Sequence, residues 1–207
     1  MLKSASLTLV QHVFELQRRM QLKKIVMSIV ALGFVLYSAV GASAYEQKSS
    51  VYPWMASFNK TGQLNLYLAG GFYYLGFDVT GGPEIILGNI DLSGIPLEWG
   101  VMGRGLVGFG SFAGASWIDW GAAPMVTLHW GTDFGGALKF EWYAGVGVGL
   151  YGTTGSYYTW AGLAGPFFGF ASADGIAWHF SESASLILDY TYTGWVSVYG
   201  LGVKLNM

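Results

Sequence analysis

The chain has 207 residues but no cysteine, and only 11% of its residues are charged, against about 25% in an average soluble domain. The lack of cysteine excludes disulfide scaffolds, thiolate metal sites, cysteine nucleophiles and lipid attachment at a cysteine. Intrinsic disorder requires few apolar residues and high charge. A composition that is 53% hydrophobic therefore excludes it.

Long apolar runs are also scarce. A helical membrane protein concentrates its apolar residues in stretches of about 20, whereas here most of them are interleaved with 32 glycines. The mean hydropathy is nevertheless +0.43. These features indicate a membrane protein that does not cross the membrane with helices.

The first 44 residues have the three parts of a secretory signal. Lys23 and Lys24 precede an apolar stretch at 25–40, which is followed by Gly-Ala-Ser-Ala at 41–44. A basic region, an apolar region and small residues at the cleavage site define a signal peptide. We therefore expect residues 1–44 to be removed and the mature protein to begin at Tyr45.

Two alternatives remain open for this region. Met20 stands just before the lysines, so residues 1–19 are either a mis-assigned start or a long basic region. Residues 25–44 are uncharged and long enough to span a bilayer as an uncleaved inner-membrane anchor. The small residues at 41–44 favour cleavage.

Few basic residues remain once the signal is removed. The mature chain has five against eleven acidic residues, a net charge of −6. Proteins that bind nucleic acid need a basic surface to neutralise phosphates. We therefore exclude nucleic acid as a partner. The remaining basic residues are Lys48, Lys60, Arg104, Lys139 and Lys204.

The rest of the chain alternates with a period of two. Between Leu138 and Tyr151, bulky apolar residues occupy every second position, and glycine or charged residues occupy the positions between them. This period is that of a β-strand with one apolar face. A membrane-spanning strand needs about 9–11 residues, and this segment is long enough.

The same pattern predicts eight antiparallel strands separated by turn residues. The expected strands are 63–77, 83–92, 96–110, 121–131, 137–152, 167–180, 184–194 and 197–207. Short turns are expected at Ser93-Gly94, 132–136 and 181–183, and longer breaks at Gly81-Gly82, 111–119, 153–166 and near Gly194. With both termini in the periplasm, the short turns also fall on the periplasmic side, as membrane barrels prefer.

Bulky residues occupy every second position of these strands, and small or charged residues occupy the positions between them; each of these two alternating sets is called a parity below. This pattern indicates an apolar outside and a polar inside. The fold class expected is all-β: an eight-stranded antiparallel transmembrane β-barrel at 62–207, after a short periplasmic segment at 45–61. Asp174 is the exception, because it shares the apolar parity of its segment. A β-bulge or a later strand start would turn it inward.

The last strand carries the sharpest resemblance to a known family. Tyr199, Leu201, Val203, Leu205 and Met207 alternate with small and polar residues up to the end of the chain. The chain resembles the small eight-stranded outer-membrane barrels of double-membraned bacteria, similar to the transmembrane part of outer-membrane protein A. That resemblance implies an outer-membrane location and a last strand read by the barrel-assembly machinery. The family commonly ends in an aromatic residue, so Met207 departs from it.

Charged residues on the inward parity form the first candidate site. An eight-stranded barrel is just filled by its own side chains, and paired charges are the least costly way to fill it. We expect a structural plug rather than a narrow pore, with Asp189 paired to Lys204 and Glu141 as a competing partner. The predicted lumen residues are Glu98, Arg104, Lys139, Glu141, Asp189 and Lys204.

No catalytic, metal or cofactor site is expected. His179 lies near Ser181, Glu182 and Ser183, but the predicted topology puts it and His129 at the periplasmic rim. The family's lipid-modifying enzymes act at the opposite end. Scattered histidines of this kind are more often hydrogen-bonding residues of a rim or lumen, and no spacing matches a metal motif.

The longest outer loop is the second candidate site, because it carries Tyr157, Tyr158 and Trp160. Exposed aromatic residues indicate contact with a surface partner or lipopolysaccharide, or else a membrane-interface girdle.

We expect a monomeric outer-membrane protein with a structural or surface-interaction role. Its partners would be outer-membrane lipid, the secretion and assembly machinery, and a host or cell-surface molecule. A narrow solute channel, an outer-leaflet lipid enzyme and a soluble ligand-binding barrel remain alternatives.

Overall fold

The computed structural model describes residues 47–73, 76–155, 165–194 and 196–207. The expected signal peptide at 1–44 and the aromatic loop residues Tyr157, Tyr158 and Trp160 lie outside these ranges. Within them, no helix is long and apolar enough to cross a membrane.

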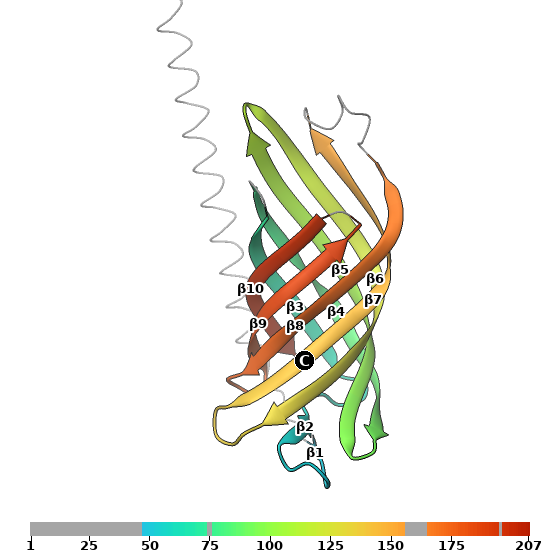
Figure 1. Ribbon diagram of the computed structural model, residues 1–207, viewed down its shortest axis with the longest axis vertical. Helices are drawn as coiled ribbons and strands as arrows, with labels where there is room; N and C mark the ends of the chain where they lie inside the picture. The colour runs from blue at the N-terminus through green and yellow to red at the C-terminus, as the bar shows by residue number, and fades with distance from the viewer. Residues whose placement is uncertain (1–46, 74–75, 156–164, 195) are drawn as a thin grey trace, which may run out of the picture. The chain divides into compact units, whose positions relative to one another are not determined.

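Eight antiparallel strands form a closed ring, called the barrel below (Figure 1). The ring order is β6-β5-β4-β3-β10-β9-β8-β7, and β7 pairs back to β6. This confirms the all-β antiparallel prediction and the ring of eight. The strands are β3 (Leu64–Tyr73), β4 (Gly76–Leu92), β5 (Ile95–Phe112), β6 (Ala115–Asp133), β7 (Lys139–Gly155), β8 (Phe167–His179), β9 (Ala184–Thr193) and β10 (Val196–Asn206).

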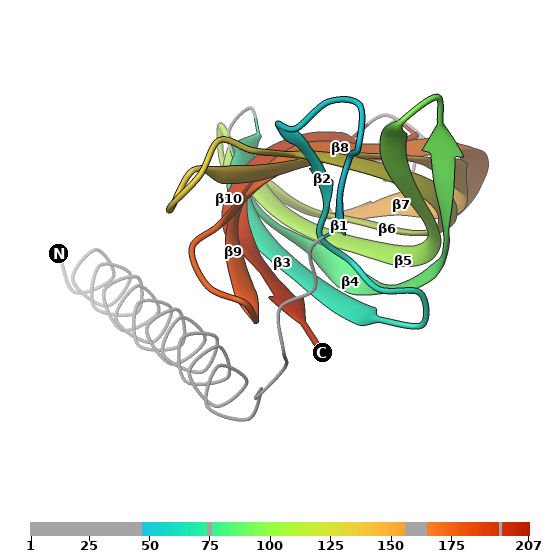
Figure 2. The same ribbon diagram turned by 90° about the horizontal axis from the view of Figure 1, so that it is seen from below.

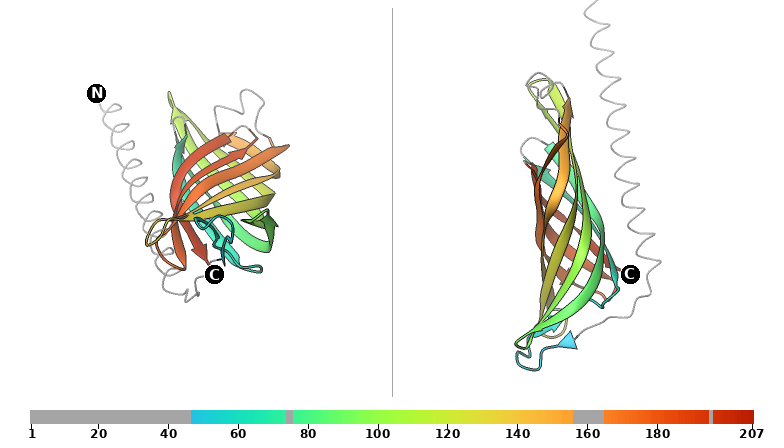
Figure 3. Two further views of the ribbon diagram at one scale, coloured as in Figure 1. Left: turned by 60° about the horizontal axis from the view of Figure 1, so that its bottom comes forward. Right: turned by 90° about the vertical axis from the view of Figure 1, so that its right-hand side faces the viewer.

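Two tight hairpin turns have the backbone that such turns require. Ser93 and Gly94 have φ of 55° and 90°, and Ala113 and Gly114 have φ of 50° and 84°. Positive φ at both central residues matches the right-handed twist of the paired strands. The longer break predicted at 111–119 was therefore wrong, because β5 and β6 extend to within two residues of each other as one long hairpin (Figure 3).

The first predicted strand and the break after it were also misplaced. β3 already ends at Tyr73, which pairs with Gly76 at the start of β4, and Gly81-Gly82 lies inside β4. Gly82 has φ of 154°, and a Cβ there would lie 1.8 Å from the carbonyl oxygen of Gly103. These glycines therefore permit close strand contact rather than a turn.

Farther along β4, the pairing with β5 shifts register between Ile86 and Gly88. A β-bulge inserts one residue into a strand and interrupts its alternation. This irregularity explains why Ile85-Ile86-Leu87 does not alternate in sequence.

The two faces of the barrel differ in chemistry. Charged and hydroxyl side chains are buried inside, together with a layer of Ala, Met and Tyr that includes Tyr67, Met102 and Tyr143. Val146 and Leu188 are 58% and 62% exposed on the outer wall. Asp174 also faces outward, because β8 pairs without interruption to both neighbours and contains no bulge to turn it.

Two short N-terminal strands, β1 (Gln47–Lys48) and β2 (Met55–Ser57), lie across one opening of the barrel (Figure 2). Residues 47–59 are called the strap. β2 pairs with the end of β6, where Met55 lies opposite Thr132. The opening covered by the strap, which also carries the turns at 93–94, 134–138 and 180–183, is called the lower end.

Candidate functional site in the barrel lumen

Glu141 is the centre of a buried polar network in the lower lumen. Its two carboxylate oxygens accept hydrogen bonds from Lys204 Nζ at 2.6 and 2.7 Å. They also contact His129 Nδ1 at 2.7 Å and His179 Nε2 at 2.8 Å. Both Glu141 and Lys204 are fully buried, so the pair is shielded from water and its partners are fixed by geometry.

His129 connects this centre to a second carboxylate. Its Nε2 lies 2.7 Å from an oxygen of Glu84, while its Nδ1 faces Glu141. A carboxylate can only accept, so both ring nitrogens must donate, which the imidazolium form does. Glu84 also accepts from Tyr67 Oη at 2.7 Å and from Thr127.

The strap completes the network from below. The backbone N–H of Asn59 donates to Glu98 at 2.8 Å, and its side-chain amide donates to the same carboxylate. Asn59 Oδ1 accepts from Lys204 Nζ at 2.9 Å. Asn59 thus links the strap to β5 and β10 at once, because Glu98 and Lys204 lie on those strands.

His179 ends a second branch. Its Nδ1 lies 2.9 Å from Ser185 Oγ, and its Nε2 lies 2.8 Å from a carboxylate oxygen of Glu141. This serine-histidine-glutamate order resembles that of a nucleophilic triad. Ser185, however, is fully buried, and the Phe58 ring stacks on His179 with centroids 4.7 Å apart. The strap therefore covers the histidine, so this arrangement works as a hydrogen-bond relay rather than an accessible nucleophile.

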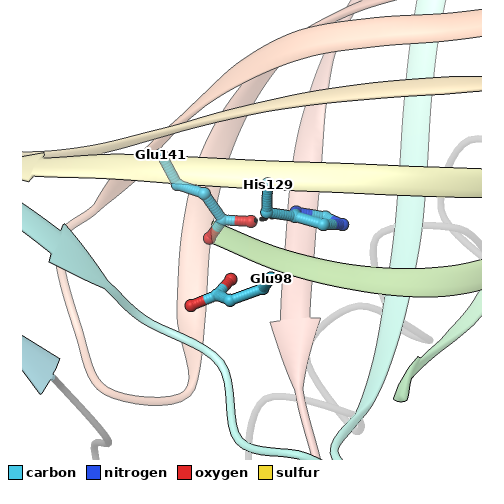
Figure 4. A group of neighbouring side chains, drawn as sticks. All are labelled: Glu98, His129 and Glu141. Atoms are coloured by element: carbon cyan, nitrogen blue, oxygen red, sulfur yellow. Dashed lines mark hydrogen bonds and ion pairs between the residues drawn. The ribbon is translucent and has the colours of Figure 1, made fainter. Parts of the chain in front are cut away.

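Glu98, His129 and Glu141 present one ligand atom each within 4.8 Å of one another (Figure 4). Carboxylates and imidazole are ligands for several divalent metals. Here Glu141 already accepts from Lys204 on both oxygens and faces both histidines, and Glu98 accepts from Asn59. A metal would have to displace the Lys204 ammonium and the proton on His129 Nδ1, so internal hydrogen bonds and ion pairs occupy this cluster.

A separate pair lies higher in the lumen. Arg104 Nη2 donates to Asp189 at 2.7 Å, and both side chains are fully buried. Tyr143 Oη also donates to Asp189. The predicted Asp189–Lys204 pair was wrong: Asp189 lies opposite Gly200, four residues from Lys204 on β10. Lys204 instead bonds Glu141, the partner that the sequence analysis had named as a competitor.

Of the six predicted lumen residues, five are buried inside the barrel: Glu98, Arg104, Glu141, Asp189 and Lys204. Lys139 is only half-buried, at the first position of β7 opposite Asp133 at the lower end. In the last strand, Tyr199 and Leu201 are exposed on the outer wall, whereas Leu205 is buried.

Glu84 and Asn59 were not among the predicted lumen residues, and His129 and His179 were expected only as hydrogen-bonding residues of the rim or lumen. Glu84 has inward parity but lies two residues before the β-bulge of β4 and next to Gly81-Gly82, where a break in the chain was expected. Asn59 lies in the strap, which has too few alternating residues to signal a position in the barrel.

No protein-family model matches the chain, and no curated protein is similar to it. Among solved structures, it is similar to a chain from a study titled "De novo design of transmembrane beta-barrels". The TM-score is 0.40 and the identity 15%, over 72% of this chain and 98% of the other.

Proposed function

We propose that the protein is an outer-membrane β-barrel whose lumen is closed by its own side chains, with a structural or surface-interaction role and no catalytic activity. The observation that carries this proposal is where the charges lie. Residues 64–207 contain thirteen charged residues, and nine of them are buried. The buried ones are Asp78, Glu84, Glu98, Arg104, Asp119, Asp133, Glu141, Asp189 and Lys204.

The outer wall is correspondingly apolar. Asp91, Lys139 and Glu182 lie at or next to the lower turns, which leaves Asp174 as the charged residue on the described wall away from the strand ends. A water-soluble barrel would need the opposite distribution, with charges outside and apolar residues inside. Such a wall is suited to lipid.

Exposed aromatic residues border this wall at both ends. Trp99, Trp178 and Phe180 lie towards the lower end, and Phe72, Phe109 and Phe168 lie towards the upper end. Aromatic girdles of this kind mark the two membrane interfaces of transmembrane barrels. Between them the wall carries Val101, Val126, Val146, Val148 and Leu188.

The filled lumen favours a plug over a channel. The Glu141 network occupies the lower lumen, and the strap adds Phe58 and Asn59, which are 6% and 0% exposed. An ion would have to break several charge-assisted hydrogen bonds to pass. Planar-bilayer recordings should therefore show no stable single-channel conductance, and steady conductance would support the narrow-channel alternative instead.

Cell fractionation tests the location directly. The protein, expressed with its N-terminal segment in a double-membraned bacterium, should appear in the outer membrane and resist carbonate extraction. Its gel mobility should change on heating, and the membrane form should begin at Tyr45, as expected if a signal peptidase and the assembly machinery process it. A protein found in the soluble periplasm, or one that keeps residues 1–44 in the inner membrane, would contradict the proposal.

A further inference from the structure

The upper lumen holds a second acidic group that the Glu141 network does not reach. Asp78, on β4, and Asp119, on β6, are 0% and 1% exposed. Both lie opposite Gly108 of β5, one from each side. Glycine has no side chain, so nothing from β5 fills the space between the two carboxylates at this level.

Hydroxyl groups from two further strands lie at this level or one inward position below it. Thr153, on β7, lies directly opposite Asp119. The Thr193 hydroxyl, on β9, lies 2.7 Å from the position that a Cβ of Gly121 would take, two residues along β6 from Asp119. Both threonines are buried, at 0% and 1% exposure.

Most of these oxygen atoms lack a partner. Both carboxylate oxygens of Asp78 and the hydroxyls of Thr153 and Thr193 have no hydrogen-bond partner in the described part of the chain. Buried polar atoms are rarely left unsatisfied, because each costs about 1–3 kcal/mol. Three unsatisfied side chains at adjacent inward positions of the upper lumen therefore indicate a ligand that supplies the missing interactions.

The charge balance shows what kind of ligand is missing. Lower in the barrel, Lys204 pairs with Glu141, His129 lies between Glu84 and Glu141, and Arg104 pairs with Asp189. Glu98 accepts hydrogen bonds from Asn59. The other basic residues after Tyr45 are Lys48, Lys60 and Lys139. All three lie at the lower end: Lys48 and Lys60 in or next to the strap, and Lys139 at the start of β7. Within the described ranges, every basic residue therefore lies lower in the barrel than Asp78.

We propose that Asp78, Asp119, Thr153 and Thr193 form a binding site for a divalent cation of the Ca²⁺ class in the upper lumen. All four donors are oxygen atoms, which select hard cations. Two carboxylates offset a 2+ charge, and neutral hydroxyls suit the larger, more flexible coordination shell of Ca²⁺. The strand spacing puts the β4 and β6 backbones about 10 Å apart, which leaves room for an ion between their carboxylates.

Terbium luminescence tests this site, because Tb³⁺ occupies Ca²⁺ sites and emits when a nearby tryptophan is excited. Trp117 lies two positions from Asp119 on the same face of β6 and is 8% exposed. The protein is refolded in detergent, so that no lipopolysaccharide competes for the ion. We expect saturable Tb³⁺ emission that Ca²⁺ displaces and that Mg²⁺ displaces less well.

The variants separate this site from surface binding. Asp78→Asn should weaken Tb³⁺ binding by at least about tenfold, because affinity follows the charge of the ligand set. Asp174→Asn makes the same chemical change on the outer wall and should leave binding unchanged. Thr153→Val keeps the side-chain shape and removes the hydroxyl, so it tests the proposed cation site if Asp78→Asn does not fold. Emission that Ca²⁺ does not displace, or that is unaltered in the folded Asp78→Asn or Thr153→Val protein, would overturn the proposal.

Discussion

Glu141 and Lys204 meet inside the barrel with Lys204 Nζ 2.6 and 2.7 Å from the two carboxylate oxygens, although β7 and β10 are separated in the ring by β8 and β9. Strand pairing alone does not bring them together. They are joined across the lumen, and the same carboxylate also holds both buried histidines. The pair therefore connects opposite parts of the wall and stabilises the closed ring.

Removing one partner of this pair should lower the free energy of unfolding. Lys204→Met or Glu141→Gln leaves an uncompensated buried charge, a change that costs about 3–5 kcal/mol in comparable pairs. Glu141→Gln should cost more, because one of the two oxygens that face His129 and His179 becomes an amide NH2 that cannot accept. Urea unfolding in lipid vesicles measures the effect, with Glu182→Gln at an exposed turn as the control. The double variant should recover part of the loss, and strictly additive losses would show that the two residues do not interact.

Asp189 should couple to Arg104 and not to Lys204. A double-mutant cycle with Arg104→Met and Asp189→Asn should give a coupling energy of roughly 0.5–3 kcal/mol, as residues in one ion-pair network do. The same cycle with Asp189→Asn and Lys204→Met should be close to additive. The reverse result would support the register predicted from sequence and contradict the pairing of Asp189 with Gly200.

The destabilisation caused by an arginine on the outer wall should depend on how deep in the membrane the residue lies. Val146→Arg should destabilise the protein in bilayers by about 2–4 kcal/mol, because Val146 lies midway along β7 and the cost peaks at the membrane centre. Leu138→Arg, just before the same strand, should cost about 0–1 kcal/mol. Unfolding free energies in vesicles measure both, and equal values would contradict a lipid-facing wall. A substitution at Gly147, the next residue of β7, would not serve as a lumen-side control. A Cβ there would lie 2.0 Å from the Pro124 carbonyl oxygen and would disturb the backbone pairing.

The strap should depend on Asn59. Asn59→Ala removes two donors from Glu98 and an acceptor from Lys204, so we expect a loss of about 1–3 kcal/mol from the unsatisfied buried groups. Amide hydrogen exchange should rise first in residues 47–58, and protease should cut there sooner. Asn89→Ala, an exposed asparagine on β4, is the matched control. Exchange rates in the strap that match those of the control would show that Asn59 does not fasten it.

Alternation allowed much of the fold to be predicted. The expected segments 137–152 and 184–194 differ from β7 and β9 by three residues or fewer at either end, because each has a bulky apolar parity. The end of β3 at Tyr73 was missed because aromatic and apolar residues continue past it in the sequence. The sequence predicts a turn at Gly81-Gly82, because sequence alone does not distinguish a glycine that bends the chain from one that lets the backbone of a neighbouring strand approach closely.

The site was less predictable than the wall. Parity tells which residues point inward, and five of the six lumen candidates are buried. It does not tell which residues meet across the lumen, since that depends on strand tilt and on side-chain length. Asp189 and Lys204 were paired because their strands are adjacent, whereas each side chain reaches a partner on a more distant strand.

The strap has a consequence for the order of assembly. Asn59 contacts Glu98 on β5 and Lys204 on β10, and Phe58 stacks on His179 at the end of β8. These contacts form a complete docking site only when β5, β8 and β10 are all in place in the closed ring. The segment that is synthesised before every barrel strand therefore reaches its final place after them, and a docked strap marks a barrel whose assembly is finished.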